Sequence, residues 1–239
     1  MCVSAINSNT KAVVLDIDGT LCSLTKGVGE IYVELLAQKG LSIEPLALNQ
    51  AVVQEWQGFL PLYLNESQGY RTSLGREREV WCEYVRRVLA RVGVRTVGQD
   101  DLVNYIYGAF ATKDYRAVAP GALEFIMRLR ERGIHVVAAT NNDERSKSVL
   151  RELGVLDKLS GAFTAGDLGW KKPSPRFYET LEQRLGFKPS ALVHVGNSIA
   201  LDIEPAQQAG WRAIYFGSSN EIALYSVGSF AALEEMFGL

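Results

Sequence analysis

Two aspartates separated by one residue follow a short apolar run near the start of the chain. The apolar run covers residues 13–15, Asp16 and Asp18 come next, and Gly19 and Thr20 end the segment. Residues i and i+2 of a strand point to the same side, so both carboxylates can face one pocket. Two carboxylates this close repel each other unless a cation or a reacting group compensates their charge. The pair therefore indicates a site for a cation or a reacting group, and the alternative is a turn that is merely rich in aspartate.

A hydroxyl and two amides follow a second apolar run. Thr140, Asn141 and Asn142 stand directly after residues 134–139 and just before a predicted helix. Hydroxyl and amide groups at the start of a helix are suited to hold the oxygens of an anion. The alternative is that Thr140 or Asn142 only caps the helix.

A pair of lysines lies in a loop that prolines make rigid. Lys171 and Lys172 precede Pro173 and Pro175, and a helix is predicted to start at Pro175. Because proline fixes its own backbone angle, the loop holds its lysines in place. A rigidly held lysine suits a site where negative charge must be neutralised. The alternative is an exposed basic loop.

The last group of polar residues follows the apolar run 192–195. Asn197 comes just after this run, and Asp202 lies on the helix that follows. Their oxygens are hard ligands of the kind that Mg²⁺ prefers, although a helix cap and a surface acid would show the same pattern. His194, within this run, and His135, in the earlier run, are predicted to be packed strand residues rather than catalysts.

These polar groups stand at the ends of strands that alternate with helices. Such alternation is typical of βαβ units and a parallel sheet, and near-continuous apolar runs indicate a sheet that is covered on both faces. The sequence therefore predicts an α/β fold: a Rossmann-like parallel sheet core with helices on both faces. The predicted strands are 13–15, 134–139, 161–165, 191–196 and 212–216, and the predicted helices are 121–132, one that starts after Asn142, 175–186, 199–209 and 229–237.

An all-helical segment interrupts this core after the aspartate pair. The spacing of apolar residues predicts helices at 28–39, 45–57, 76–92 and about 99–110, with a loop at 61–73. We expect an α/β core built from residues 1–22 and 117–239 and a helical cap at 23–116. Ligand sites of open parallel sheets lie outside the carboxyl ends of the strands, so the cap emerges directly over the predicted site.

The composition excludes several classes of protein. Of 239 residues, 47% are hydrophobic and 22% are charged, and the formal net charge is -2, so we expect no nucleic-acid or membrane partner. The cysteines, which lack metal-type spacing, are predicted to be reduced thiols of a cytoplasmic protein without a secretory signal; they are Cys2, Cys22 and Cys82. Cys22 is either a reactive thiol or a small residue packed under the loop.

Together these segments resemble the four motifs of the haloacid dehalogenase-like superfamily of hydrolases, in the same order. The first motif is matched by residues 16–20, the second by Thr140, the third by Lys172 before Pro173, and the fourth by residues 196–198 with Asp202. The resemblance covers about residues 11–217. The helical insert resembles the cap of the subgroup that includes phosphoglycolate phosphatase.

The resemblance implies an Mg²⁺-dependent phosphatase that hydrolyses a small phosphorylated metabolite through an aspartyl-phosphate intermediate. Asp16 would be the nucleophile, and Asp18 the general acid and base. Thr140 and Lys172 would complete the catalytic set by holding the phosphoryl oxygens. The implied phosphate-binding residues also include Gly19, Thr20 and Asn141, and the implied Mg²⁺ ligands are Asp16, Asp18, Asn197 and Asp202. The cap would exclude water and select the substrate.

One position departs from the family pattern. Asn197 stands where the fourth motif usually has an aspartate, which implies one negative charge fewer and weaker metal binding. A metal-independent 2-haloacid dehalogenase is similar to this chain at Asn197 and Tyr178, but such enzymes typically lack the second aspartate, here Asp18. A non-catalytic binding or regulatory protein on the same fold is the other alternative.

The identity of the substrate is not predicted. The cap offers candidates for contact with a leaving group, which are Tyr63, Tyr70, Arg71, Arg76 and Trp81. For the aromatic residues the alternative is helix packing, and for the arginines it is exposure to solvent. The protein is expected to be a monomer or a homodimer.

Overall fold

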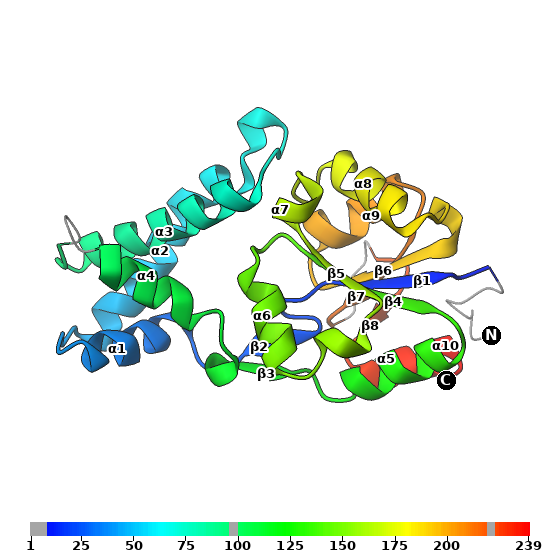
Figure 1. The fold of residues 1–239 in the computed structure, drawn as a ribbon, viewed down its shortest axis with the longest axis horizontal. Coiled ribbons are helices and arrows are strands. Elements are labelled where there is room, and N and C mark those ends of the chain that lie inside the picture. Colours follow the sequence, from blue (N-terminus) through cyan, green and yellow to red (C-terminus); the bar gives the residue numbers. More distant parts are fainter. Residues whose placement is uncertain (1–8, 96–99, 219–222) are drawn as a thin grey trace.

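A six-stranded parallel sheet forms the core of the protein. The computed structural model describes residues 9–95, 100–218 and 223–239. The strands are β1 Ala12–Leu15, β4 His135–Thr140, β5 Gly161–Thr164, β6 Leu192–Gly196, β7 Arg212–Phe216 and β8 Ser226–Val227. They are hydrogen-bonded in the order β5-β4-β1-β6-β7-β8 (Figure 1). The first strand of the chain therefore lies inside the sheet, between β4 and β6.

Helices cover both faces of the sheet. They are α5 Ala122–Glu131, α6 Arg145–Glu152, α7 Ala165–Leu168, α8 Pro175–Leu185, α9 Glu204–Gln208 and α10 Phe230–Phe237. Val13 and Leu15 of β1 pack in one apolar cluster with α5 and α10, whereas Ala12 and Val14 pack in another with α8 and α9. Neighbouring residues of a strand point to opposite faces, so a strand covered on both sides must be apolar throughout. The predicted α/β fold is confirmed.

A second group of helices forms the cap, at the left of Figure 1. Its members are α1 Val28–Gln38, α2 Pro45–Leu64, α3 Leu74–Arg91 and α4 Asp100–Ala109. The cap has an apolar core of its own, in which Leu36, Leu48 and Val88 are fully buried. A short antiparallel pair, β2 Cys22–Leu24 and β3 Arg116–Val118, stands where the chain leaves the core and returns to it. The predicted limits of the cap, residues 23 and 116, fall within these two strands. The division of the chain into a core and a cap domain at these limits stays a prediction.

The second cap helix is longer than the sequence predicts. α2 runs on past Pro61, where a loop is predicted. Proline removes one helical hydrogen bond, but the rings of Phe59 and Tyr63, on either side of it, both pack against Trp56 and hold this turn in place. Asn65, with a φ of 58° in the left-handed region, ends the helix.

The helix predicted at 199–209 also has a different form. It begins as a π-helical turn, Ile199–Ile203, and continues as α9. π-Helical turns occur frequently at functional sites, and this one carries Asp202. The remaining short elements do not show a periodic pattern in the sequence; besides β2, β3 and β8 they are the 3₁₀ turns Glu66–Gln68, Lys113–Tyr115, Leu156–Lys158 and Pro189–Ala191.

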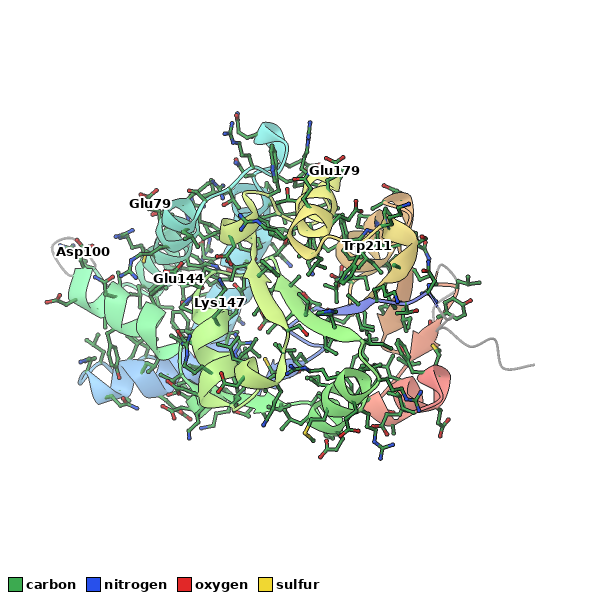
Figure 2. The ribbon with its side chains drawn as sticks, turned by 45° about the vertical axis from the view of Figure 1, so that its right-hand side comes forward. Glu79, Asp100, Glu144, Lys147, Glu179 and Trp211 are labelled. Carbon is green, nitrogen blue, oxygen red and sulfur yellow. The ribbon has the colours of Figure 1, made fainter. Side chains whose placement is uncertain are left out.

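The surface carries many charged side chains, such as Glu79, Asp100 and Glu179, which lie on the outside of the molecule (Figure 2). No helix in the described parts of the chain combines the length with the apolar character that a membrane crossing requires.

Cys22 is packed rather than reactive. It is fully buried in the apolar cluster on one face of the sheet, and burial raises the pKa of its thiol to about 12. The thiolate is the reactive form of cysteine, so the packed alternative is the one that the structure supports. Cys82 is also a buried free thiol, and Cys2 lies outside the described residues.

Candidate active site

The ends of three neighbouring strands bring the predicted residues to one edge. In the sheet Leu15 is paired with Ala138 on one side and with Val195 on the other. Asp16 follows Leu15, and its backbone N–H donates to the carbonyl of Val195 at 2.8 Å. Thr140 ends the strand on the opposite side. The polar residues after β1, β4 and β6 therefore meet at the carboxyl edge of the sheet, where ligands of such folds bind.

Lys172 lies between two carboxylates. Its Nζ is 2.7 Å from Oδ1 of Asp16 and 2.5 Å from Oδ1 of Asp202, and all three side chains are buried. Burial raises the pKa of Asp16 to about 7, although Lys172 acts in the opposite direction. Burial alone lowers the pKa of a lysine, but the two carboxylates outweigh it and raise the pKa of Lys172. The ammonium group therefore stays charged and can neutralise an anion beside Asp16.

Protein donors occupy the Asp202 carboxylate. Oδ1 contacts Lys172 and lies 3.1 Å from Nε2 of His194, and Oδ2 accepts the backbone N–H of Ser198 at 3.0 Å. Only a glycine fits at Gly196, since a Cβ there would be 2.4 Å from Cγ of Asp202. Burial opposes ionisation, yet Lys172 and His194 hold the pKa of Asp202 below its usual range. The carboxylate predicted as a metal ligand is thus engaged in holding Lys172.

The two histidines differ in their surroundings. His194 is fully buried in β6, where its ring contacts those of Tyr178 and Trp211, and burial lowers its pKa. Its prediction as a packed strand residue is confirmed. His135 is the first residue of β4 and is exposed beside Phe187. The prediction that the residue is packed within the strand is wrong for His135, because His135 is the first residue of the strand and its side chain is exposed there.

Asp18 has partners of its own. Nδ2 of Asn142 donates to Oδ2 of Asp18 at 2.7 Å, and the guanidinium group of Arg116 forms an ion pair with Oδ1. Gly19 follows with a φ of 81°, a left-handed conformation that turns the chain back. The two carboxylates of the opening motif are therefore held separately, Asp16 by Lys172 and Asp18 by Arg116 and Asn142.

Arg116 is a site residue that the sequence pattern does not single out. Arg116 is 98 positions away from Asp18 in the chain, on the strand by which the chain returns from the cap. Nothing in its neighbourhood marks it, because its partner is set by tertiary structure alone. Asn142 belongs to the polar group after β4, and its position directly beside Thr140 and Asn141 is the signal that points to it.

Two buried hydroxyls face different surroundings at this edge. Oγ1 of Thr140 accepts the backbone N–H of Asn142 at 3.1 Å, in the turn that precedes α6 and not at the helix N-cap, which is Glu144. Oγ1 of Thr20 is buried without a hydrogen-bond partner among the described residues. A buried hydroxyl without a partner is unfavourable, so Thr20 has a donor available for an oxygen of a bound anion.

Gly19 and Asn141, both predicted to bind phosphate, already have partners in the protein. The N–H of Gly19 donates to the carbonyl of Cys22 at 2.8 Å. The amide of Asn141 accepts from the backbone N–H of Lys172 at 2.6 Å and donates to its carbonyl at 2.8 Å. Asn141 thus fixes the backbone of Lys172, and its predicted contact with phosphate stays a prediction.

Several oxygens at this edge accept no hydrogen bond from the described residues, among them Oδ2 of Asp16, the carbonyl of Asp18 and Oδ1 of Asn197. The Asn197 side chain lies against Gly19, where a Cβ would be 2.1 Å from Nδ2. Mg²⁺ prefers such hard oxygens and usually keeps several waters. Within the described ranges, no cluster of three His, Cys, Asp or Glu residues is placed to hold a metal. The donors therefore fit a hydrated Mg²⁺ with one carboxylate ligand.

A buried ion pair joins the cap to the loop that carries Lys172. Lys171 and Glu77 of α3 are both fully buried, with Nζ 2.7 Å from Oε2. The same Nζ donates to the carbonyl of Asn141 at 3.0 Å and lies 3.6 Å from the centre of the Tyr63 ring. Burial lowers the pKa of Lys171 to about 8, although Glu77 acts in the opposite direction. The alternative of an exposed basic loop is wrong for both lysines.

Most of the cap residues considered for the leaving group belong to this junction. The N–H of Lys171 donates to the carbonyl of Tyr70 at 2.9 Å, Arg71 lies over the ring of Trp170, and the hydroxyl of Tyr63 donates to the carbonyl of Asn141 at 2.9 Å. Arg76 donates to the carbonyl of Leu62 at 2.6 Å. Trp81, in contrast, lines a cavity between cap and core.

Comparison with known proteins identifies the family to which the sequence is similar. The model of the haloacid dehalogenase-like hydrolase family matches residues 10–210. The human haloacid dehalogenase-like hydrolase domain-containing protein 3 is 26% identical over 197 residues, which are 82% of this chain and 77% of that protein. A phosphoglycolate phosphatase of Rhodospirillum rubrum is 28% identical over 232 residues, 96% of this chain and 89% of its own.

The fold is also similar to solved structures. A HAD-hydrolase of Bacillus subtilis whose structure contains magnesium has a TM-score of 0.77 at 16% identity, over 96% of this chain and 99% of that one. Solved dehalogenases share the fold as well. At these identities the likeness concerns the fold alone.

Proposed function

The chain belongs to the haloacid dehalogenase-like hydrolase family, and we propose that it is a phosphatase that cleaves a phosphate monoester through an aspartyl-phosphate intermediate. The observation that carries this proposal is the separate placement of two carboxylates. Asp16 stands beside a buried ammonium group, and Asp18 is held on the cap side by Arg116 and Asn142. A displacement that needs a nucleophile and a proton donor requires two such groups in different positions.

The first step is attack by Asp16 on phosphorus. One oxygen of Asp16 is bound by Lys172, and the other accepts no hydrogen bond from the described residues. This free oxygen forms the new bond to phosphorus while the bond to the leaving oxygen breaks. Lys172 remains next to the reacting group and offsets the negative charge of the phosphoryl oxygens, and Thr20 and Thr140 add hydroxyl donors.

Asp18 moves the proton in both steps. In the first step its protonated carboxyl group gives a proton to the leaving oxygen, which departs as a neutral alcohol. In the second step the carboxylate takes a proton from the water that attacks the phosphorus of the acyl phosphate, which frees Asp16 and phosphate. Arg116 and Asn142 hold the Asp18 carboxyl group in one orientation throughout.

We propose Mg²⁺ as the cofactor. Asp16, the carbonyl of Asp18 and Asn197 would hold it, and the ion would supply positive charge that lets an anionic phosphate approach an anionic carboxylate. Because only one of these three ligands is charged, we expect weak binding of the free ion. Asp202 keeps Lys172 in place and takes part through it.

The test is hydrolysis of p-nitrophenyl phosphate with and without Mg²⁺, on the wild type and on Asp16→Asn. We expect Mg²⁺-dependent turnover by the wild type and none by the variant, with unchanged circular dichroism. Absence of turnover at every Mg²⁺ concentration would refute the phosphatase, and turnover by a folded Asp16→Asn would refute the nucleophile.

The second candidate is a metal-independent 2-haloacid dehalogenase, which the amide at Asn197 favours. Asp18 argues against it, because displacement of halide needs no proton donor. Chloride release from 2-chloropropionate without metal would support this candidate. A protein that binds phosphate esters without turning over either substrate would correspond to the non-catalytic alternative.

A further inference from the structure

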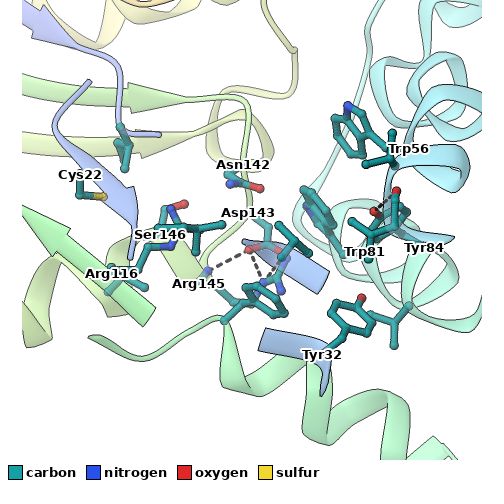
Figure 3. A pocket seen from close by; sticks show the side chains of 18 of the residues that line it. Cys22, Tyr32, Trp56, Trp81, Tyr84, Arg116, Asn142, Asp143, Arg145 and Ser146 are labelled. Atoms are coloured by element: carbon teal, nitrogen blue, oxygen red, sulfur yellow. Dashed lines mark hydrogen bonds and ion pairs between the residues drawn. The ribbon is translucent and has the colours of Figure 1, made fainter. Parts of the chain in front are cut away.

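A cavity of about 470 Å³ lies between the cap and the core (Figure 3). Arg116 and Asn142 line it, and these are the two residues that hold Asp18. In the proposed reaction Asp18 protonates the leaving oxygen, and we place the leaving group in this cavity because both partners of Asp18 line it. The cavity is large enough for a ligand of moderate size.

The cap side of the cavity is aromatic. Trp56 and Trp81 are stacked, with ring centres 5.9 Å apart and an interplanar angle of 15°, and Tyr84 stands edge-on to both of them. Ring faces and edges of this kind bind another ring by stacking or by edge contact. Figure 3 shows these residues across the cavity from Arg116 and Asn142.

The core side of the cavity carries both apolar and polar side chains. Ile17 and Val149 line it next to Asn142, and Val28 and Val52 continue the apolar lining on the cap. Three polar atoms of the cavity lining are buried without a hydrogen-bond partner among the described residues: Nε1 of Trp81, Nε of Arg116 and Oδ1 of Asn142. A polar group on the leaving group would pair with such atoms.

The charged groups of the cavity compensate one another. Arg145 donates from Nε to both carboxylate oxygens of Asp143, at 2.9 and 3.0 Å, and to the carbonyl of Tyr107 from NH1 at 3.1 Å. Its guanidinium group lies 3.9 Å from the centre of the Tyr107 ring. Arg116 is paired with Asp18. Among the described residues that line the cavity, every cation therefore has a carboxylate partner, and none is left for a second anionic group of a substrate.

We infer that the substrate is a monophosphate ester of a ring-bearing alcohol or phenol, and that it has no carboxylate or second phosphate in its leaving group. The inference rests on the proposed phosphatase function. This substrate preference would distinguish the protein from a phosphatase that acts on phosphoglycolate. The leaving group of phosphoglycolate is a small carboxylate, which needs a cation of its own. Trp81 and Trp56 are the residues that give this preference.

The test compares kcat/KM for three substrates in the presence of Mg²⁺: 2-naphthyl phosphate, phenyl phosphate and phosphoglycolate. Phenol and 2-naphthol are similar leaving groups chemically, so a difference between them reports on contact with the second ring. We expect 2-naphthyl phosphate to exceed phenyl phosphate by about 10-fold, mainly through KM, and to exceed phosphoglycolate by at least about 100-fold. Equal values, or a preference for phosphoglycolate, would overturn the inference while leaving the phosphatase function intact.

A matched pair of variants locates the preference. Trp81→Leu should bring the naphthyl-to-phenyl ratio of kcat/KM close to one, mainly through a higher KM for 2-naphthyl phosphate. Trp211→Leu, in the apolar cluster between the sheet and helices α8 and α9 and outside the cavity lining, should keep the wild-type ratio. Thermal unfolding shows whether each variant is folded. An unchanged ratio in folded Trp81→Leu would refute the assignment of this residue.

Binding of 2-naphthol to the wild type, followed by calorimetry, tests the cavity without catalysis. We expect 2-naphthol to bind and to lose at least about 10-fold in affinity in Trp81→Leu. If no phosphate ester were hydrolysed but 2-naphthol bound in this way, the proposed function would fail and the apolar site would stand. If 2-naphthol did not bind, the inference would fail on its own.

Discussion

Removal of Glu77 should destabilise the protein far more than removal of an exposed glutamate. Glu77 and Lys171 are both completely buried, and their charged groups are 2.7 Å apart. Glu77→Ala leaves the Lys171 ammonium group without a counter-charge in surroundings that exclude water. Removing one partner of a buried pair typically costs about 3–5 kcal/mol. Since a domain is typically stable by about 5–15 kcal/mol, a large part of the stability would be lost.

The other half of this prediction concerns the double variant Glu77→Leu/Lys171→Met. It removes both charges and fills the space with apolar atoms, so the penalty of an unpaired charge disappears. Replacing a buried pair in this way is often neutral or stabilising. We therefore expect the double variant to be more stable than Glu77→Ala by about 3 kcal/mol, even though it has lost the same ion pair.

Urea unfolding measures these differences through the midpoint at constant m-value. Glu83→Ala is the matched control, because Glu83 is on the same helix and pairs with Arg87 at 2.9 Å, but both side chains are about 40% exposed, at 42% and 40%. An exposed pair contributes about 0–1 kcal/mol. If Glu77→Ala lost no more than Glu83→Ala, or if the double variant were as unstable as Glu77→Ala, the pair would not be a desolvated ion pair.

Three further outcomes are expected. Asn197→Asp adds a negative charge to the proposed metal ligands and should lower the Mg²⁺ activation midpoint roughly 10-fold, about 1.4 kcal/mol; an unchanged activation curve would show that position 197 does not contact the ion. Lys172→Met should reduce kcat by about 10²–10³, measured with p-nitrophenyl phosphate, and activity within 10-fold of the wild type would contradict the role of the ammonium group. The pKa of Lys171 is lowered from 10.5 to about 8 in the folded protein, so from about pH 8 to about pH 10 the unfolded chain holds a proton that the folded chain has lost. The free energy of unfolding should then rise with pH, on the order of 2 kcal/mol, relative to Glu77→Leu/Lys171→Met; parallel urea curves for the two proteins across this range would contradict the sign.

The residues that could be predicted from the sequence are those whose position follows from local pattern. Asp16 and Thr140 directly follow or end apolar strands, and the carboxyl ends of parallel strands meet at one edge. Lys172 is held by prolines close to the start of a helix, which identifies the loop but not its burial. The helix α2 extends beyond its predicted end because rings on either side of Pro61 pack together, and packing of this kind has no signature in helical spacing.

The contacts that could not be predicted join parts of the chain that are far apart in the sequence. Arg116 and Asp18 are 98 positions apart, and Lys171 and Glu77 are 94 apart. Neither the spacing nor the type of these residues indicates the partner, since many other arginines and glutamates have the same local pattern. The contact between Asp202 and Lys172 could not be predicted for the same reason. Whether the Asp202 oxygens face a metal or Lys172 depends on where the loop at 169–174 returns to the sheet.

Two consecutive lysines explain why a buried ion pair stands at the edge of the cap. The ammonium group of Lys171 faces Glu77 of the cap, and that of Lys172 faces Asp16 of the core. Asn141 holds both lysines. Its backbone carbonyl accepts a hydrogen bond from Nζ of Lys171, and its side-chain amide forms hydrogen bonds with the backbone N–H and carbonyl of Lys172. A charge beside a reacting phosphate is effective only where its position is fixed. The cap therefore does more than cover the site: through Glu77 it takes part in fixing the loop from which Lys172 reaches the nucleophile.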